Sequence, residues 1–81
     1  MYDLEAFLKE ERGGDYVLGE LLMLCATREP PHETSFNSAL VFYESDRDVF
    51  RFGHDVDLDK EFELTRGELR HLVKLAIAQD V

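Results

Sequence analysis

The chain has 81 residues and carries 18 acidic against 9 basic side chains, which gives a formal net charge of −9. The length fits one domain with a modest core, spanning residues 1–81. The acidic excess argues against direct binding to nucleic acid or to an anionic membrane, because phosphate contacts need Lys and Arg. It favours a protein partner with a basic surface, although excess acid also simply keeps a small protein in solution.

The cysteine content and the apolar pattern exclude further classes of protein. Cys25 is the only cysteine, so the chain can form no intrachain disulfide and no multi-cysteine metal site. The acidic start lacks the positive charge of a signal peptide, and no apolar run reaches the length of a membrane span. We therefore expect a cytoplasmic protein.

The first element is expected to be a short helix. Asp3 can cap its start, and Gly13 with Gly14 would end it. The residues that would lie on its buried face are Leu4, Phe7 and Leu8.

The segment of residues 16–27 is ambiguous between helix and strand. Its Leu, Met, Glu and Ala content favours a helix, which Asp15 could cap. The residues that would also fit a buried strand are Leu18, Leu22 and Leu24. Helix is the favoured interpretation, and Pro30 with Pro31 ends the segment in either case.

A β-hairpin is predicted over residues 38–53. Residues 39–43 are rich in strand formers, residues 45–48 have the polar composition of a turn, and residues 49–52 form the return strand. Gly53 would end the hairpin.

A final helix is predicted over residues 66–79. Thr65 and Glu68 form a capping box, and Leu64 with Leu69 forms the matching hydrophobic staple. The face expected to be buried comprises Leu69, Leu72, Val73 and Ala76. The fold class is therefore α+β: an N-terminal helix, the ambiguous segment, an antiparallel hairpin plus a third strand, and a C-terminal helix packed on the sheet.

Three bases are spaced along that last helix: Arg66, Arg70 and Lys74. Neighbours at this spacing share a helix face. Either this face is simply solvated, or it docks an acidic partner or the acidic strand of a second copy.

The third strand is predicted from the alternation between His54 and Leu64, which only Lys60, on the apolar side, interrupts. The acids that would share one face of an extended strand are Asp55, Asp57, Asp59, Glu61 and Glu63. The apolar residues that would point to the core are Val56, Leu58, Phe62 and Leu64. Alternate residues on a strand lie about 6.6–6.8 Å apart, so the carboxylates would form a row comparable in spacing to nucleic-acid phosphates. A solvated edge strand with a charged outer face would give the same alternation.

Metal and catalytic interpretations find less support. The acidic run matches the opening of a calcium-binding loop, but Lys60 replaces the glycine of the turn and Arg66 replaces the bidentate glutamate. Cys25 lies within an apolar run and is expected to be a buried, inert residue. We expect no catalytic residue, no metal site and no cofactor.

The sequence thus suggests a small acidic protein-binding module rather than an enzyme. The leading hypothesis is an inhibitor that masks the basic, nucleic-acid-binding surface of a partner, as phage anti-defence proteins and antitoxin or immunity proteins do. The alternative is an accessory or scaffold subunit that docks a larger assembly through an apolar surface. The residues expected to bind the partner are Asp55, Asp57, Asp59, Glu61 and Glu63, together with Asp46 and Asp48.

Overall fold

The computed structural model describes residues 2–11, 14–36, 39–54 and 56–79. Seven elements follow one another along the chain. They are α1 (Leu4–Glu10), α2 (Gly14–Ala26), β1 (Glu33–Ser35), β2 (Ala39–Glu44), β3 (Val49–His54), β4 (Phe62–Thr65) and α3 (Arg66–Gln79).

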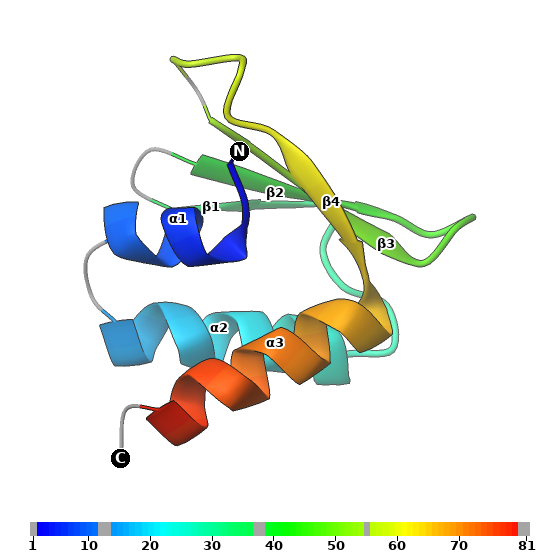
Figure 1. The fold of residues 1–81 in the computed structure, drawn as a ribbon. Coiled ribbons are helices and arrows are strands. Elements are labelled where there is room, and N and C mark those ends of the chain that lie inside the picture. Colours follow the sequence, from blue (N-terminus) through cyan, green and yellow to red (C-terminus); the bar gives the residue numbers. More distant parts are fainter. Residues whose placement is uncertain (1, 12–13, 37–38, 55, 80–81) are drawn as a thin grey trace.

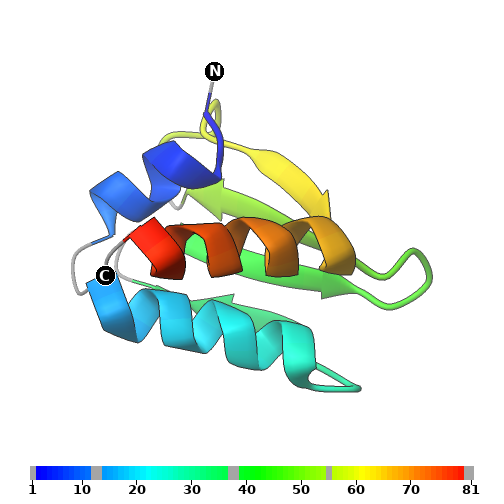
Figure 2. The ribbon, with the colours of Figure 1, turned by 60° about the horizontal axis from the view of Figure 1, so that its bottom comes forward.

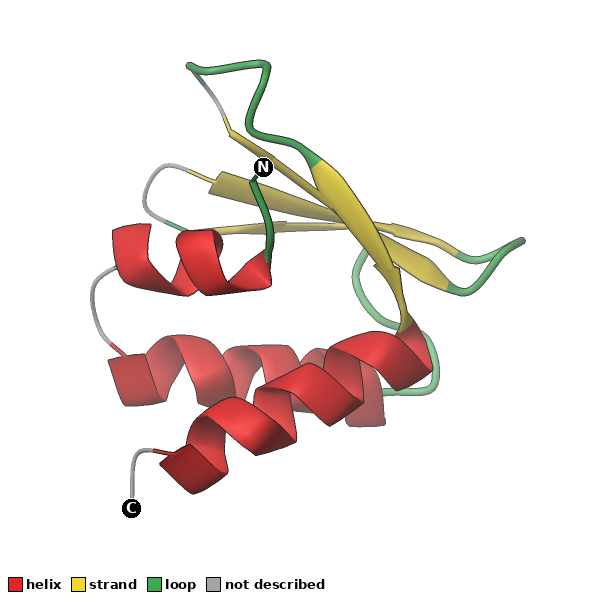
Figure 3. Cartoon of the chain, in the orientation of Figure 1, coloured by secondary structure: helices red, strands yellow, loops and turns green. Residues whose placement is uncertain are grey.

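The fold has two layers, with the helices on one side of an antiparallel sheet (Figure 1, Figure 2). The sheet order is β1-β2-β3-β4, so each strand pairs with its neighbour in the sequence. Colouring by secondary structure makes the separation plain (Figure 3). The expected α+β class is confirmed, and α3 contacts both the sheet and α2.

The core lies between the two layers. Val41, Phe50 and Phe52 alternate along β2 and β3 and are each 1% exposed, as expected for the covered face of a half-buried sheet. The helices contribute fully buried side chains that include Phe7, Leu21, Leu69 and Val73. The other face of the sheet is not covered by helices. It carries the side chains that alternate with the buried ones along β2 and β3.

Helix α1 is capped as the sequence predicts. The Asp3 carboxylate accepts a hydrogen bond from the backbone N–H of Ala6 at 3.0 Å. The helix ends at Glu10, before the two glycines, of which Gly13 lies outside the described residues. Phe7 is fully buried and meets the rings of Phe36 and Phe52 edge-on, with centroids at 5.6 and 5.1 Å, a favourable aromatic geometry.

The ambiguous segment is a helix, as favoured. The buried side chains of α2 recur at helical rather than alternating spacing, namely Val17, Leu18, Leu21, Leu24 and Cys25. Because α2 begins at Gly14, Asp15 lies inside the helix and not at its cap.

The hairpin is confirmed, although residue 38 of its predicted range lies outside the described residues. Gly53 does not end it, because β3 continues to His54 and Gly53 pairs with Leu40. One strand was missed. β2 and β3 pair in register from Ala39↔His54 to Glu44↔Val49, around the predicted turn. The sequence analysis predicts no strand between the two prolines and the hairpin, yet β1 pairs with β2. The strand has no apolar residue that could have predicted it: it consists of Glu33, Thr34 and Ser35. Short polar strands are common at sheet edges, where they hinder pairing with other chains.

The expectation of one extended strand from His54 to Leu64 is wrong. β4 covers only its last part, and the register pairs Phe52 with Phe62. An antiparallel partner cannot follow β3 directly, since the chain must first reverse direction, and the intervening residues form that connection. Val56 and Leu58, expected in the core, are 81% and 82% exposed.

Helix α3 has the predicted bounds and the predicted capping box. The Thr65 hydroxyl accepts from the Glu68 N–H at 3.1 Å, while the Glu68 carboxylate accepts from the Thr65 N–H at 2.9 Å. These hydrogen bonds hold the pKa of Glu68 below its usual value. Leu69 and Val73 are buried as expected, but Leu72 is 37% exposed, so its assignment to the core is wrong.

Arg66, the first residue of α3, joins three parts of the fold. One guanidinium nitrogen donates to the backbone carbonyls of Cys25 and Thr27 at 2.5 and 2.8 Å, at the carboxyl end of α2. Another donates to the Asp48 carboxylate at 3.0 Å, in the turn between β2 and β3. Its side chain is only 16% exposed, so the expected solvated basic stripe does not begin here.

These positions give a direct stability comparison on α3. Leu69→Ala removes a fully buried side chain, and we expect it to lower the free energy of unfolding by about 2–5 kcal/mol. Leu72→Ala should cost less than about 1 kcal/mol, because the side chain is already partly in water. Urea denaturation of both variants measures the difference, and equal losses would show that Leu72 is core.

Candidate functional site

The connection between β3 and β4 projects beyond the sheet (Figure 1). Its described part is residues 56–61, named here the acidic loop. At its base the His54 Nδ1 accepts hydrogen bonds from the backbone N–H groups of Val56 and Asp57, at 3.2 and 2.9 Å. The Asp57 carboxylate accepts from the Asp59 N–H at 3.1 Å, a local turn typical of aspartate.

Lys60 ties the acidic loop to α1. Its ammonium group lies 2.5 Å from the Glu10 carboxylate and 5.9 Å from the centre of the Tyr2 ring. The hydrogen bond to Lys60 lowers the pKa of Glu10, and burial together with Glu10 raises the pKa of Tyr2 to about 12. The loop is thus anchored on both sides of its exposed tip.

The tip presents apolar and acidic side chains together. Val56 and Leu58 expose more of their surface than any other large apolar residue that the structure describes. Between and after them stand Asp57, Asp59 and Glu61, all exposed. No ion pair involves these three carboxylates within the described part of the chain.

The other predicted contact residues lie elsewhere. Glu63 is on β4, where both of its oxygens accept from the Arg47 guanidinium at 3.1 Å. Asp48 is engaged with Arg66, and the Tyr43 hydroxyl also donates to it at 2.7 Å, which lowers its pKa. Asp46 is exposed at the hairpin turn, at the opposite end of β3 from the acidic loop. Asp55 lies outside the described residues.

Four of the described bases join different parts of the fold. On the open sheet face, Arg47 and Arg51 both bind Glu44, and Arg47 also binds Glu63. Lys60 and Arg66 bind acids of other elements, as described above. The acids left without a basic partner therefore include those of the acidic loop.

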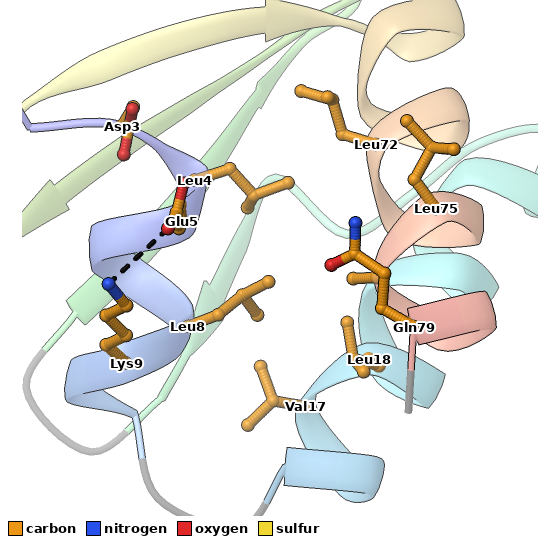
Figure 4. A pocket seen from close by; sticks show the side chains of 11 residues that line it. Asp3, Leu4, Glu5, Leu8, Lys9, Val17, Leu18, Leu72, Leu75 and Gln79 are labelled. Carbon is orange, nitrogen blue, oxygen red and sulfur yellow. Dashed lines mark ion pairs between the residues drawn. The ribbon is translucent and has the colours of Figure 1, made fainter. Parts of the chain in front are cut away.

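A second surface lies between α1, α2 and α3, and is named here the helical groove (Figure 4). It has a volume of about 730 Å³. Leu4 and Leu8 of α1 point toward it, opposite Leu72 of α3. The apolar residues that line it are Leu4, Leu8, Val17, Leu18, Leu72, Leu75 and Ala76.

Sequence reasoning missed this groove, although α3 held a signal. Leu75 and Ile77 lie outside the face expected to be buried, and they are 46% and 37% exposed. A helix with apolar residues beyond one stripe has more apolar surface than a single core can cover.

Within the described residues, no group of three or more His, Cys, Asp or Glu is placed to hold a metal ion. None of the described helices combines the length and the apolar content that crossing a bilayer requires. Cys25 is a free thiol, 2% exposed. Burial raises its pKa, which suppresses the reactive thiolate.

No protein-family model matches this chain, and the searches of curated proteins and of solved structures found no match either.

The state of Cys25 gives a direct chemical prediction. A maleimide should label it slowly in the folded protein and rapidly in guanidinium chloride, because the thiol is both buried and protonated. Mass spectrometry over time follows the reaction. Equally fast labelling in both conditions would contradict the buried position and reopen a nucleophilic role.

Proposed function

We propose that the protein is an acidic protein-binding module that masks a basic, nucleic-acid-binding surface of a partner. The observation that carries this proposal is the acidic loop. Three carboxylates without ion pairs lie beside two largely exposed apolar side chains, Val56 and Leu58. Carboxylates attract a basic surface over distance, and apolar side chains add contact area once water is displaced.

The position of the loop acids beside two exposed apolar side chains supports this function over a purely solubilising one. Intramolecular pairing uses Glu10, Glu44, Glu63 and Asp48 to hold elements together. The loop acids do not contribute to the fold in this way, and their mutual repulsion is only partly screened by salt. Binding to a basic partner would relieve that repulsion. The loop acids would then compete with nucleic acid for the Lys and Arg side chains of that partner.

A second candidate function is favoured by a separate observation, the helical groove. An accessory or scaffold subunit docks through apolar surface, and the groove offers such a surface away from the acidic loop. The two functions differ in salt dependence, because apolar docking weakens little as ionic strength rises.

A displacement experiment tests the leading function. A short arginine-rich peptide is bound to a fluorescent DNA oligonucleotide, and the protein is added until the DNA is released. The variant Asp57→Asn, Asp59→Asn, Glu61→Gln should need about five- to tenfold more protein, since each lost exposed charge pair is worth about 0.2–1 kcal/mol. The advantage of the wild type over this variant should shrink as salt is raised, because salt screens the charges that the variant lacks.

The matched control is Glu20→Gln, Glu29→Gln, Glu33→Gln. It removes the same charge from side chains that also lack ion pairs in the described structure. We expect less than a twofold change for this control, because its residues lie outside the loop. Equal losses in the two variants would show that only net charge matters, and the acidic loop would not be the binding site.

A further inference from the structure

We propose that the helical groove binds an amphipathic helix of a partner protein, one with lysine or arginine beside its apolar stripe. This inference goes beyond the acidic loop and does not depend on it. It develops the second candidate function by naming the chemistry of the occupant.

The groove is a gap in the helical layer. α1 and α3 form its two walls and α2 forms its floor, as the close view shows (Figure 4). Two wall residues, Leu72 and Leu75, are 37% and 46% exposed despite lying next to buried neighbours. Covering them would remove apolar surface from water at little cost to the fold, since the walls already exist.

The walls determine the backbone conformation of the occupant. The lining residues come from helices, whose interior N–H and C=O groups already bond to one another. An extended peptide would therefore find no sheet edge to pair with, and its backbone groups would be buried without partners. A helix satisfies its own backbone and presents side chains at i, i+3, i+4 and i+7 to a groove.

Charge decides between a foreign helix and a second copy. The polar residues at the α1 rim are Asp3, Glu5 and Lys9, and Lys9 already lies 3.4 Å from Glu5. The rim is therefore left with net negative charge. A second copy would bring another −9 to the contact, whereas a basic helix would meet opposite charge there.

The test uses a defined probe peptide made of leucine and lysine, with leucines at helical spacing. Two matched peptides accompany it: a scrambled one of the same composition, and one in which glutamate replaces every lysine. Binding is measured by fluorescence anisotropy, and the contact is located by NMR amide shifts in the labelled protein. The patterned Leu/Lys peptide should bind best and should shift amides of α1 and α3.

Variants then locate the apolar contact. Leu72→Gln with Leu75→Gln should weaken the Leu/Lys peptide by about tenfold, because polar groups would replace the wall. The control is Met23→Gln with Ile77→Gln. Ile77 lies on the same helix as Leu72 with the same 37% exposure but does not line the groove, and Met23 is 61% exposed on α2. The control should change affinity less than twofold.

Several results would overturn the inference. Equal binding by the scrambled peptide, or equal losses in the two double variants, would mean that charge alone draws the probe. Equal binding by the Leu/Glu peptide would remove the charge argument. Self-association of the protein that Leu72→Gln with Leu75→Gln abolishes would make the occupant a second copy. The acidic-loop variant should bind the Leu/Lys peptide as well as wild type does. That result would support the groove as the binding site even if the proposed masking function failed.

Discussion

Arg66 is the contact on which the arrangement of this small fold depends. Its guanidinium group reaches the last carbonyls of α2, the Asp48 carboxylate of the hairpin turn and the Tyr43 hydroxyl, from a position where β4 becomes α3. Helix ends leave carbonyls without internal partners, and a cation there also matches the helix dipole. One side chain therefore satisfies polar groups of elements that are far apart in the sequence. The left-handed conformation of Asp48, at a φ of 54°, belongs to this same junction.

A division of charge follows from this construction. Arg66, Arg47, Arg51 and Lys60 are all committed to acids within the fold, so the surplus of acid appears where no framework contact is needed. The acidic loop is one such place, and Lys60 and His54 hold its base while its tip stays exposed. The helical groove is the second surface that no other part of the described fold covers. Its lining is mostly apolar, whereas the acidic loop is charged. These two chemically different surfaces are the basis of the binding functions that we propose.

The sequence predicts those features that depend on neighbouring residues. The capping box of Thr65 and Glu68 sets the start of α3 because both hydrogen bonds span three residues, and the polar turn sets the hairpin. The extent of β4 was not predictable from alternation, since alternation says nothing about where the chain must reverse. The role of Arg66 was also hidden, because its partners lie 18 to 41 residues away. For the candidate site, the sequence identified the acids of the loop but placed Val56 and Leu58 in the core. An aspartate-rich run is a better turn former than strand former, and this was the signal available.

The most direct measurement is the unfolding free energy of Arg66→Ala, obtained by chemical denaturation beside Arg70→Ala as the control. Arg70 is an exposed base one turn further along the same helix. Arg66→Ala should lose about 2–4 kcal/mol, because several charged hydrogen bonds, some of them partly buried, are lost together. Arg66→Lys should lose most of that amount as well, since lysine keeps the charge but not the planar fork of donors. Arg70→Ala should change stability by no more than about 0.5 kcal/mol. Similar, small losses in all three variants would contradict the central role assigned to Arg66.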